Sequence, residues 1–143
     1  MSNPPAGTVT HAPIEVRWVS GQAFEAGRAQ GPTVRIDGEG RTAPSPFDVL
    51  LAAIATCAAV DLVTILEKQR TPVHALGIRV ESNRLDSIPR RLASAVLHFT
   101  ICAPGTTIEK ATRAVELSVT KYCSVRSSLI ADASVSWQVQ LGD

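Results

Sequence analysis

Two of the three cysteines occupy positions from which a thiol could take part in redox chemistry. Cys57 lies in the middle of a long apolar segment, and its small alanine and threonine neighbours leave space above the sulfur. Cys123 stands at the end of a second predicted helix, in the sequence Tyr-Cys-Ser-Val-Arg. An isolated buried cysteine is more often only a small apolar side chain, so both interpretations stay open. Because Asp61, one turn after Cys57, would raise the pKa of that thiol, thiolate chemistry requires a nearby cation.

The sequence offers little support for other kinds of site. His11, His74 and His98 have no metal-ligand spacing with one another or with the cysteines, and no Cys-x-x-Cys occurs, so no metal is expected. No glycine-rich phosphate loop is present, so no nucleotide cofactor is expected either. Cys102 shares one face of a predicted strand with His98. We interpret this pair as an ordinary sheet face, which leaves Cys102 outside the candidate pair.

Charge and composition narrow the function further. The chain has 143 residues with 14 Lys+Arg and 13 Asp+Glu, a formal net charge of +1. A nucleic-acid partner is not expected, because binding to phosphates needs a basic excess. Hydrophobic residues make up 45% of the chain, which is typical of a folded domain. Three cysteines are too few for a secreted disulfide scaffold, and no signal peptide is apparent, so we expect a reducing, cytoplasmic location.

The N-terminal half predicts a flexible arm, a meander and a helix start. Residues 1–13 carry three prolines and few large apolar groups, as in a loose arm. Residues 14–19 alternate apolar and polar types, and residues 22–27 and 33–36 follow as further short strands between glycine turns, which indicates an antiparallel meander. Ser45, Pro46 and Asp48 then fit the N-cap, first and third positions of a helix.

The predicted central helix is apolar around its whole circumference. Residues 49–60 carry no formal charge, and the apolar pattern continues until Thr71 and Pro72 stop it. The uncharged stretch is shorter than the roughly 20 residues that cross a bilayer, so no membrane contact is expected. A helix that is apolar on all sides must instead be covered by protein on all sides. We therefore expect a second subunit to contribute part of that cover.

The C-terminal half completes an α+β pattern. Residues 76–81 and 95–101 alternate as strands, and the charged residues 83–91 connect them as a long loop. A second helix is predicted from residues 104–107 to near Cys123, followed by a last strand over residues 135–141. The predicted order is therefore βββ-α-ββ-α-β.

Residues 45–61 and 121–125 resemble the two cysteine motifs of the OsmC/Ohr family, and the chain is most similar to its YhfA-like branch. The resemblance covers residues 14–143, which it identifies as a single OsmC-like domain. It implies an OsmC-like fold, with antiparallel sheets around a long buried central helix and an intertwined homodimer. That implication agrees with the cover that the apolar helix requires.

The resemblance also implies a peroxidase mechanism. Cys57 would attack an organic hydroperoxide, its sulfenic acid would condense with Cys123, and a dithiol reductant of the lipoyl type would reset the pair. The expected function is a thiol-dependent peroxidase in oxidative-stress defence. The alternative is a non-catalytic OsmC-like protein that binds a small apolar ligand or senses redox state.

The family's catalytic carboxylate corresponds to Asp48, which is a third candidate catalytic residue. Asp48 precedes Cys57 by nine residues, about 13.5 Å along a helix and about half a rotation away. It could therefore act on the thiol only across a subunit interface or through other groups. Its position as a helix-capping carboxylate is sufficient to explain it.

The chain departs from the family at the thiolate-stabilising arginine. Gln22, after Gly21, occupies the place where that arginine is expected. Arg17, Arg35 and Arg126 are the possible substitutes. Without one of them, a buried thiol should stay protonated and react slowly.

Overall fold

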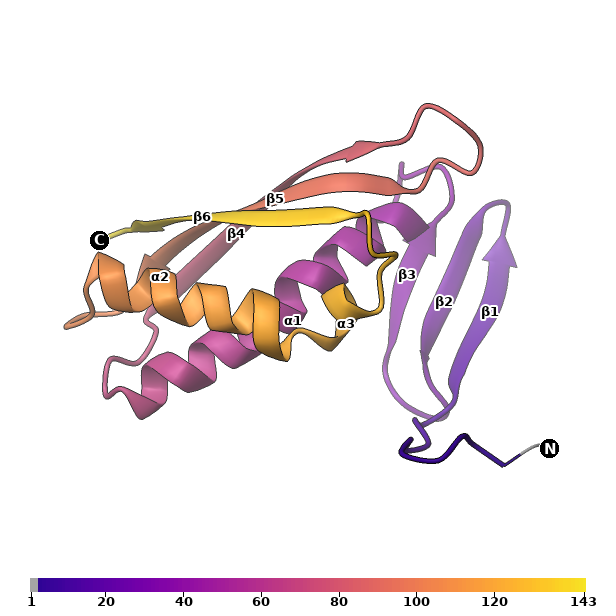
Figure 1. Ribbon diagram of the computed structural model, residues 1–143. Helices are drawn as coiled ribbons and strands as arrows, with labels where there is room; N and C mark the ends of the chain where they lie inside the picture. Colours follow the sequence, from indigo (N-terminus) through magenta and orange to yellow (C-terminus); the bar gives the residue numbers. More distant parts are fainter. Residues whose placement is uncertain (1–2) are drawn as a thin grey trace. The chain divides into compact units, whose positions relative to one another are not determined.

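The computed structural model describes residues 3–143, and the chain divides into two compact units, Met1–Leu50 and Leu51–Asp143. The first unit contains an antiparallel sheet in the order β1-β2-β3 (Figure 1), which confirms the predicted meander. Its strands are β1 (Ile14–Ser20), β2 (Ala23–Arg28) and β3 (Thr33–Asp37). Residues 3–13 form no helix or strand. The flexibility of residues 1–13, of which the first two lie outside the described residues, and the single domain over 14–143 stay predictions.

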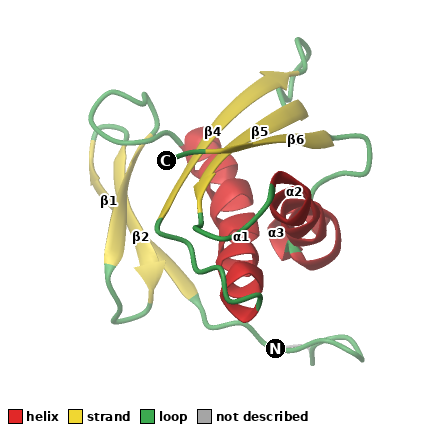
Figure 2. Cartoon of the chain, turned by 90° about the vertical axis from the view of Figure 1, so that its left-hand side faces the viewer, coloured by secondary structure: helices red, strands yellow, loops and turns green. Residues whose placement is uncertain are grey.

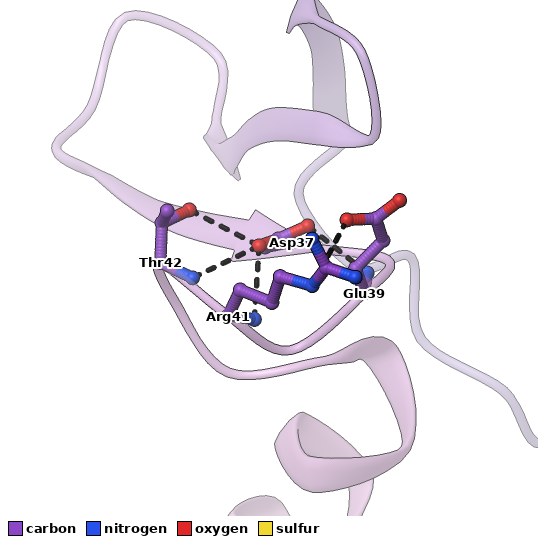
Figure 3. A network of polar contacts seen from close by, with 4 residues as sticks. All are labelled: Asp37, Glu39, Arg41 and Thr42. Atoms are coloured by element: carbon purple, nitrogen blue, oxygen red, sulfur yellow. Dashed lines mark hydrogen bonds and ion pairs between the residues drawn. The ribbon is translucent and has the colours of Figure 1, made fainter.

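Asp37, the last residue of β3, fixes the loop that leads to the first helix. Its carboxylate accepts hydrogen bonds from the backbone N–H groups of Glu39, Arg41 and Thr42 at 2.9, 3.0 and 3.0 Å, and from the Thr42 hydroxyl at 3.1 Å (Figure 3). The Thr42 and Glu39 amides contribute most to lowering the pKa of Asp37 to about 2. The sequence indicated only a turn here, whereas the structure shows one carboxylate holding the whole loop.

Helix α1 (Pro46–Lys68) begins at the predicted position but is buried along one face only. That face consists of Ile54, Ala55, Ala58, Leu62 and Leu66. Val60 and Val63, on other sides of the helix, are 67% and 40% exposed. One chain therefore covers one face of α1, and the expected cover of its other sides by a second subunit stays a prediction.

Among residues 3–143, α1 alone is long and apolar enough to cross a membrane by length and composition. A core helix of a folded domain passes the same test. Leu62 and Leu66 are completely buried within the chain, as in a core helix. The absence of membrane contact stays a prediction.

The second unit contains a mixed sheet in the order β4-β5-β6 (Figure 2). Its strands are β4 (Ala75–Arg84), β5 (Leu92–Cys102) and β6 (Ser134–Leu141). β4 and β5 are antiparallel, as predicted for a hairpin, but β5 and β6 run parallel. The expectation of purely antiparallel sheets is wrong at this pair. A helical crossover joins β5 to β6, and such a connection returns the chain in the same direction.

The core of the second unit lies on one face of this sheet. On β5, Ala95, Leu97, Phe99 and Ile101 are at most 1% exposed. The helix α2 (Ile108–Leu117) buries Ala111, Ala114 and Val115. Helix α2 and the part of α1 from residue 51 onward lie along the same side of the sheet (Figure 2). The two-sheet α+β class is thereby confirmed, and the second unit's core supports α1 around Cys57.

Candidate active site

Cys57 lies near the middle of α1 and is half-buried. The next residue, Ala58, is completely buried, so the helix is anchored beside the thiol. The Cys57 Sγ atom is 3.8 Å from the Ser124 Oγ atom. This contact brings α1 against the segment that follows the second helix, where Cys123 also lies.

Cys123 occupies the junction between two helical segments and is 1% exposed. It has an extended backbone and is the N-cap of the short helix α3 (Ser124–Ser127). Its Sγ atom accepts a hydrogen bond from the Arg126 N–H at 3.3 Å and lies 3.9 Å from the carbonyl oxygen of Ile54 on α1. The structure therefore brings the two predicted cysteines together, although their catalytic roles stay predictions.

The helix that precedes Cys123 changes from α to π geometry in its last turn, and helical structure ends at Tyr122, next to Cys123 as predicted. Helix α2 ends at Leu117 and is followed by a π-helical turn, η1 (Ser118–Tyr122). The hydroxyls of Ser118 and Thr120 donate to carbonyl oxygens four residues earlier, at 2.8 and 2.7 Å, within this region. Bonds of this kind compete locally with regular helix geometry. The chain leaves the helix at Cys123 and turns its sulfur toward α1.

The pKa of Cys57 is lowered, although burial acts in the opposite direction. The backbone N–H of Val125 has the largest lowering effect, followed by the Cys123 thiol and by the hydroxyl and N–H of Ser124. All of these groups can donate a hydrogen bond to a thiolate, and donors to the charged form lower a pKa. Cys57 is therefore the better nucleophile of the two thiols.

The pKa of Cys123 is raised, chiefly by burial. The Arg126 N–H opposes this effect, but the neighbouring Cys57 adds to it, because two thiolates side by side would repel each other. The two opposite shifts mean that Cys57 ionises to a thiolate more readily than Cys123. The thiolate is the form that can start a nucleophilic attack.

Of the three arginines considered from the sequence, Arg17 and Arg35 both act on Glu25 in the first unit. Arg35 pairs with Glu25 at 2.7 Å within the first unit. Arg126 reaches Cys123 through its backbone N–H rather than through its guanidinium. The side chain of Gln22 covers Gly38, where an added Cβ would come within 2.6 Å of its Oε1 atom. The groups that lower the pKa of Cys57 are thus uncharged, and sequence reasoning missed them. A cysteine followed by Ser-Val at a helix start was the signal that could have found them.

Asp48 forms the predicted capping box with Ser45. The Ser45 N–H donates to Asp48 Oδ2 at 2.8 Å, and the Asp48 N–H donates to Ser45 Oγ at 3.1 Å. The Ser45 N–H and hydroxyl lower the pKa of Asp48. This carboxylate therefore stabilises the start of α1, and its catalytic role stays a prediction.

The sequence profile of the family described as OsmC-like protein matches residues 38–138 of this chain. The chain belongs to the OsmC family. It is 38% identical to protein YhfA of Escherichia coli K12 over 111 residues, covering 77% of this chain and 83% of YhfA. The resemblance to the OsmC/Ohr family is thereby confirmed.

Solved OsmC structures share the fold at low sequence identity. The OsmC-like protein of Mycoplasma pneumoniae superposes with a TM-score of 0.79 at 16% identity, covering 95% of this chain and all of that one. An organic hydroperoxide resistance protein OsmC of Legionella pneumophila gives a TM-score of 0.66 at 14% identity, covering 93% and 98% of the two chains. These similarities confirm the OsmC-like fold.

The capping role of Asp48 in this OsmC-family chain can be separated from a catalytic role by a pair of variants. Ser45→Ala should cost about 1 kcal/mol of unfolding free energy, because it removes a helix N-cap. Asp48→Asn should lower the thermal midpoint by only a few degrees. Neither variant should change the rate at which peroxide oxidises Cys57, measured by loss of free thiol. A much slower oxidation in Asp48→Asn alone would instead place Asp48 in the chemistry.

Cys102 and His98 have contacts of their own on the sheet of the second unit. Cys102 ends β5 opposite Ala75, and all three cysteines are free. His98 contacts Glu81 at 3.3 Å on the face of the sheet away from the core. Within residues 3–143 no group of three or more histidine, cysteine, aspartate or glutamate side chains could hold a metal ion.

Proposed function

We propose that this OsmC-family protein is a thiol-dependent peroxidase that reduces organic hydroperoxides in oxidative-stress defence. The observation that carries the proposal is the asymmetric thiol pair. Cys57, with a lowered pKa, lies on α1, and Cys123, with a raised pKa, faces it from the start of α3. A reactive thiolate beside a protonated partner thiol is the arrangement that a two-cysteine peroxidase cycle needs.

The chemistry proceeds in three balanced steps. The Cys57 thiolate attacks the terminal oxygen of the hydroperoxide, the O–O bond breaks, and the departing alkoxide takes up a proton to become an alcohol. Cys57 is now a sulfenic acid. The Cys123 sulfur then attacks the Cys57 sulfur, the S–O bond breaks, and water leaves with the Cys123 proton. An external dithiol, such as a lipoyl group, finally reduces the disulfide by exchange and is itself oxidised to a disulfide.

Two relatives support the substrate class. The Legionella pneumophila structure and OhrB of Bacillus subtilis are both described as organic hydroperoxide resistance proteins. OhrB superposes with a TM-score of 0.61 at 16% identity. Since identities this low show the fold alone, the proposal for this chain depends on its own thiol pair.

Counting free thiols tests the proposal directly. One equivalent of cumene hydroperoxide should remove two of the three thiols rapidly, and a dithiol should restore them over repeated cycles. Hydrogen peroxide serves as the comparison, and it should react more slowly if the site prefers organic substrates. Reaction of both peroxides at the slow rate of free cysteine would exclude a peroxidase. A single rapid oxidation without repeated turnover would favour the redox-sensing alternative.

We also propose that the working unit is a homodimer in a reducing cytoplasm. The support is the surface of α1, where Val60 and Val63 are exposed on a helix whose residues 49–60 carry no charged side chain. Apolar side chains gathered on one helix are typical of an interface between subunits. Sedimentation equilibrium of the purified protein measures its mass and so checks this proposal.

A further inference from the structure

The segment that follows Cys123 forms several hydrogen bonds within its own turn. The Ser127 N–H donates to the Cys123 carbonyl oxygen at 3.1 Å, and the Arg126 N–H donates to the Cys123 sulfur at 3.3 Å. The carbonyl oxygen of Ser124 accepts two bonds from Ser128, from its N–H at 3.1 Å and from its hydroxyl at 2.8 Å. The main chain at Ser124 is therefore hydrogen-bonded within this turn.

Ser124 presents its hydroxyl to Cys57 from this hydrogen-bonded turn. The Oγ and Sγ atoms are 3.8 Å apart, within the range of a hydrogen bond that involves sulfur. The backbone N–H of the same residue and that of Val125 also favour a negative charge on the Cys57 sulfur. A donor that is already in place costs no reorganisation when charge develops, so it stabilises an anion more effectively than a mobile group does.

We propose that Ser124 is a catalytic residue, whose hydroxyl donates a hydrogen bond to the Cys57 thiolate and orients the sulfur for attack on the peroxide. The hydroxyl keeps its proton throughout and forms no covalent bond. The Ser124 hydroxyl and the neighbouring backbone N–H groups thereby stabilise the thiolate without the nearby cation that the sequence led us to expect. The inference rests on the proposed function, because it concerns Cys57 as the attacking group.

Stabilisation of the Cys57 thiolate by uncharged donors should depend less on ionic strength than stabilisation by a charged side chain. Interactions between exposed charges weaken when salt is added, whereas a hydrogen bond from a neutral hydroxyl depends less on salt because its donor carries no formal charge. The reactivity of Cys57 should therefore be nearly the same at low and high ionic strength. A strong decrease in high salt would point to an arginine, in the same chain or a partner, as the stabilising group.

The experiment compares three serine variants of the full-length protein. Ser124→Ala removes the hydroxyl, Ser124→Thr keeps it, and Ser127→Ala removes a hydroxyl from the same turn as a matched control. Alkylation of Cys57 by iodoacetamide is followed against pH by peptide mass spectrometry. At neutral pH, Ser124→Ala should react roughly two- to tenfold more slowly, because an exposed contact of 3.8 Å has the strength of an ordinary hydrogen bond at most. Ser124→Thr and Ser127→Ala should match the unmodified protein.

The outcomes separate this inference from the proposed function. Alkylation needs no peroxide, so Ser124 can be shown to support the thiolate even if the protein reduces no hydroperoxide. If peroxide reduction is rapid but Ser124→Ala keeps an unchanged alkylation profile, the role of Ser124 is refuted and the peroxidase stands. If Ser124→Ala does not fold, Ser124→Thr still tests the inference. Slower alkylation of Cys57 in folded Ser124→Thr than in the unmodified protein would overturn it, because the threonine retains the hydroxyl.

Discussion

Cys57→Ser is expected to abolish the rapid, peroxide-dependent loss of thiols. A serine hydroxyl is neither ionised at neutral pH nor oxidised by a hydroperoxide, so the first bond cannot form. The rate should fall by at least about a hundredfold, which corresponds to about 2.7 kcal/mol in activation free energy. Stopped-flow measurement with cumene hydroperoxide, with the thiols counted at each time point, gives this rate.

The matched control for this variant is Cys102→Ser. Cys102 lies at the end of β5 and has no part in the proposed pair, so this variant should keep the full rate of oxidation. Its two remaining thiols should then disappear together. Rapid oxidation that survives in Cys57→Ser, or that vanishes in Cys102→Ser, would contradict the assignment of the pair.

Cys123→Ser is expected to separate the first oxidation from the formation of the disulfide. The Cys123 thiol is one of the groups that lower the pKa of Cys57, and a serine hydroxyl can take over as a donor. The first oxidation should therefore slow by no more than roughly tenfold. No disulfide can follow, so Cys57 should persist as a sulfenic acid and then gain further oxygen from excess peroxide.

Dimedone labelling and intact-mass spectrometry measure these products. The variant should take up dimedone after one equivalent of peroxide, whereas the unmodified protein should lose its reactivity toward dimedone as the disulfide forms. Repeated turnover with a dithiol should fail once the sulfenic acid is oxidised further. A variant that still forms an intramolecular disulfide would show that Cys102, rather than Cys123, resolves the intermediate.

The sequence was sufficient for those parts of the fold that depend on local patterns. Alternation of apolar and polar residues located β1 and β6 to within one residue of their ends, and β4 and β5 to within three, because this pattern is a local property of a strand. The start of α1 followed from Ser45 and Asp48, whose side chains cap the helix through contacts only three residues apart. Signals of this kind are complete within a short stretch of chain.

The parts that sequence reasoning missed depend on longer-range or irregular structure. The parallel pairing of β6 with β5 is set by how the crossover packs, and strand patterns do not record direction. The π-helical turn before Cys123 keeps the composition of an ordinary helix. Because that turn determines where Cys123 points, its consequence for the site was also hidden.

The groups that lower the pKa of Cys57 could not be predicted from the sequence either. Cys57 and Cys123 were identified as a pair, and their side chains do lie together. The expectation of a nearby cation assumed that a thiolate is stabilised by a charged side chain. The backbone N–H groups that lower the pKa of Cys57 are instead common to almost every residue type, so they leave no signal in the sequence. Backbone donors become visible only when the direction of the chain is known.

The sulfur of Cys123 also serves as the N-cap of α3, which ties the oxidation state of the pair to the order of the following turn. A disulfide between Cys57 and Cys123 uses the same sulfur atom that accepts the hydrogen bond from the Arg126 N–H. If forming the disulfide destabilises the α3 turn, reducing the disulfide restores the same free energy, because the two changes belong to one thermodynamic cycle. A turn that resists oxidation therefore makes the disulfide easier to reduce. In this way four residues of helix can set how readily the protein is returned to its starting state.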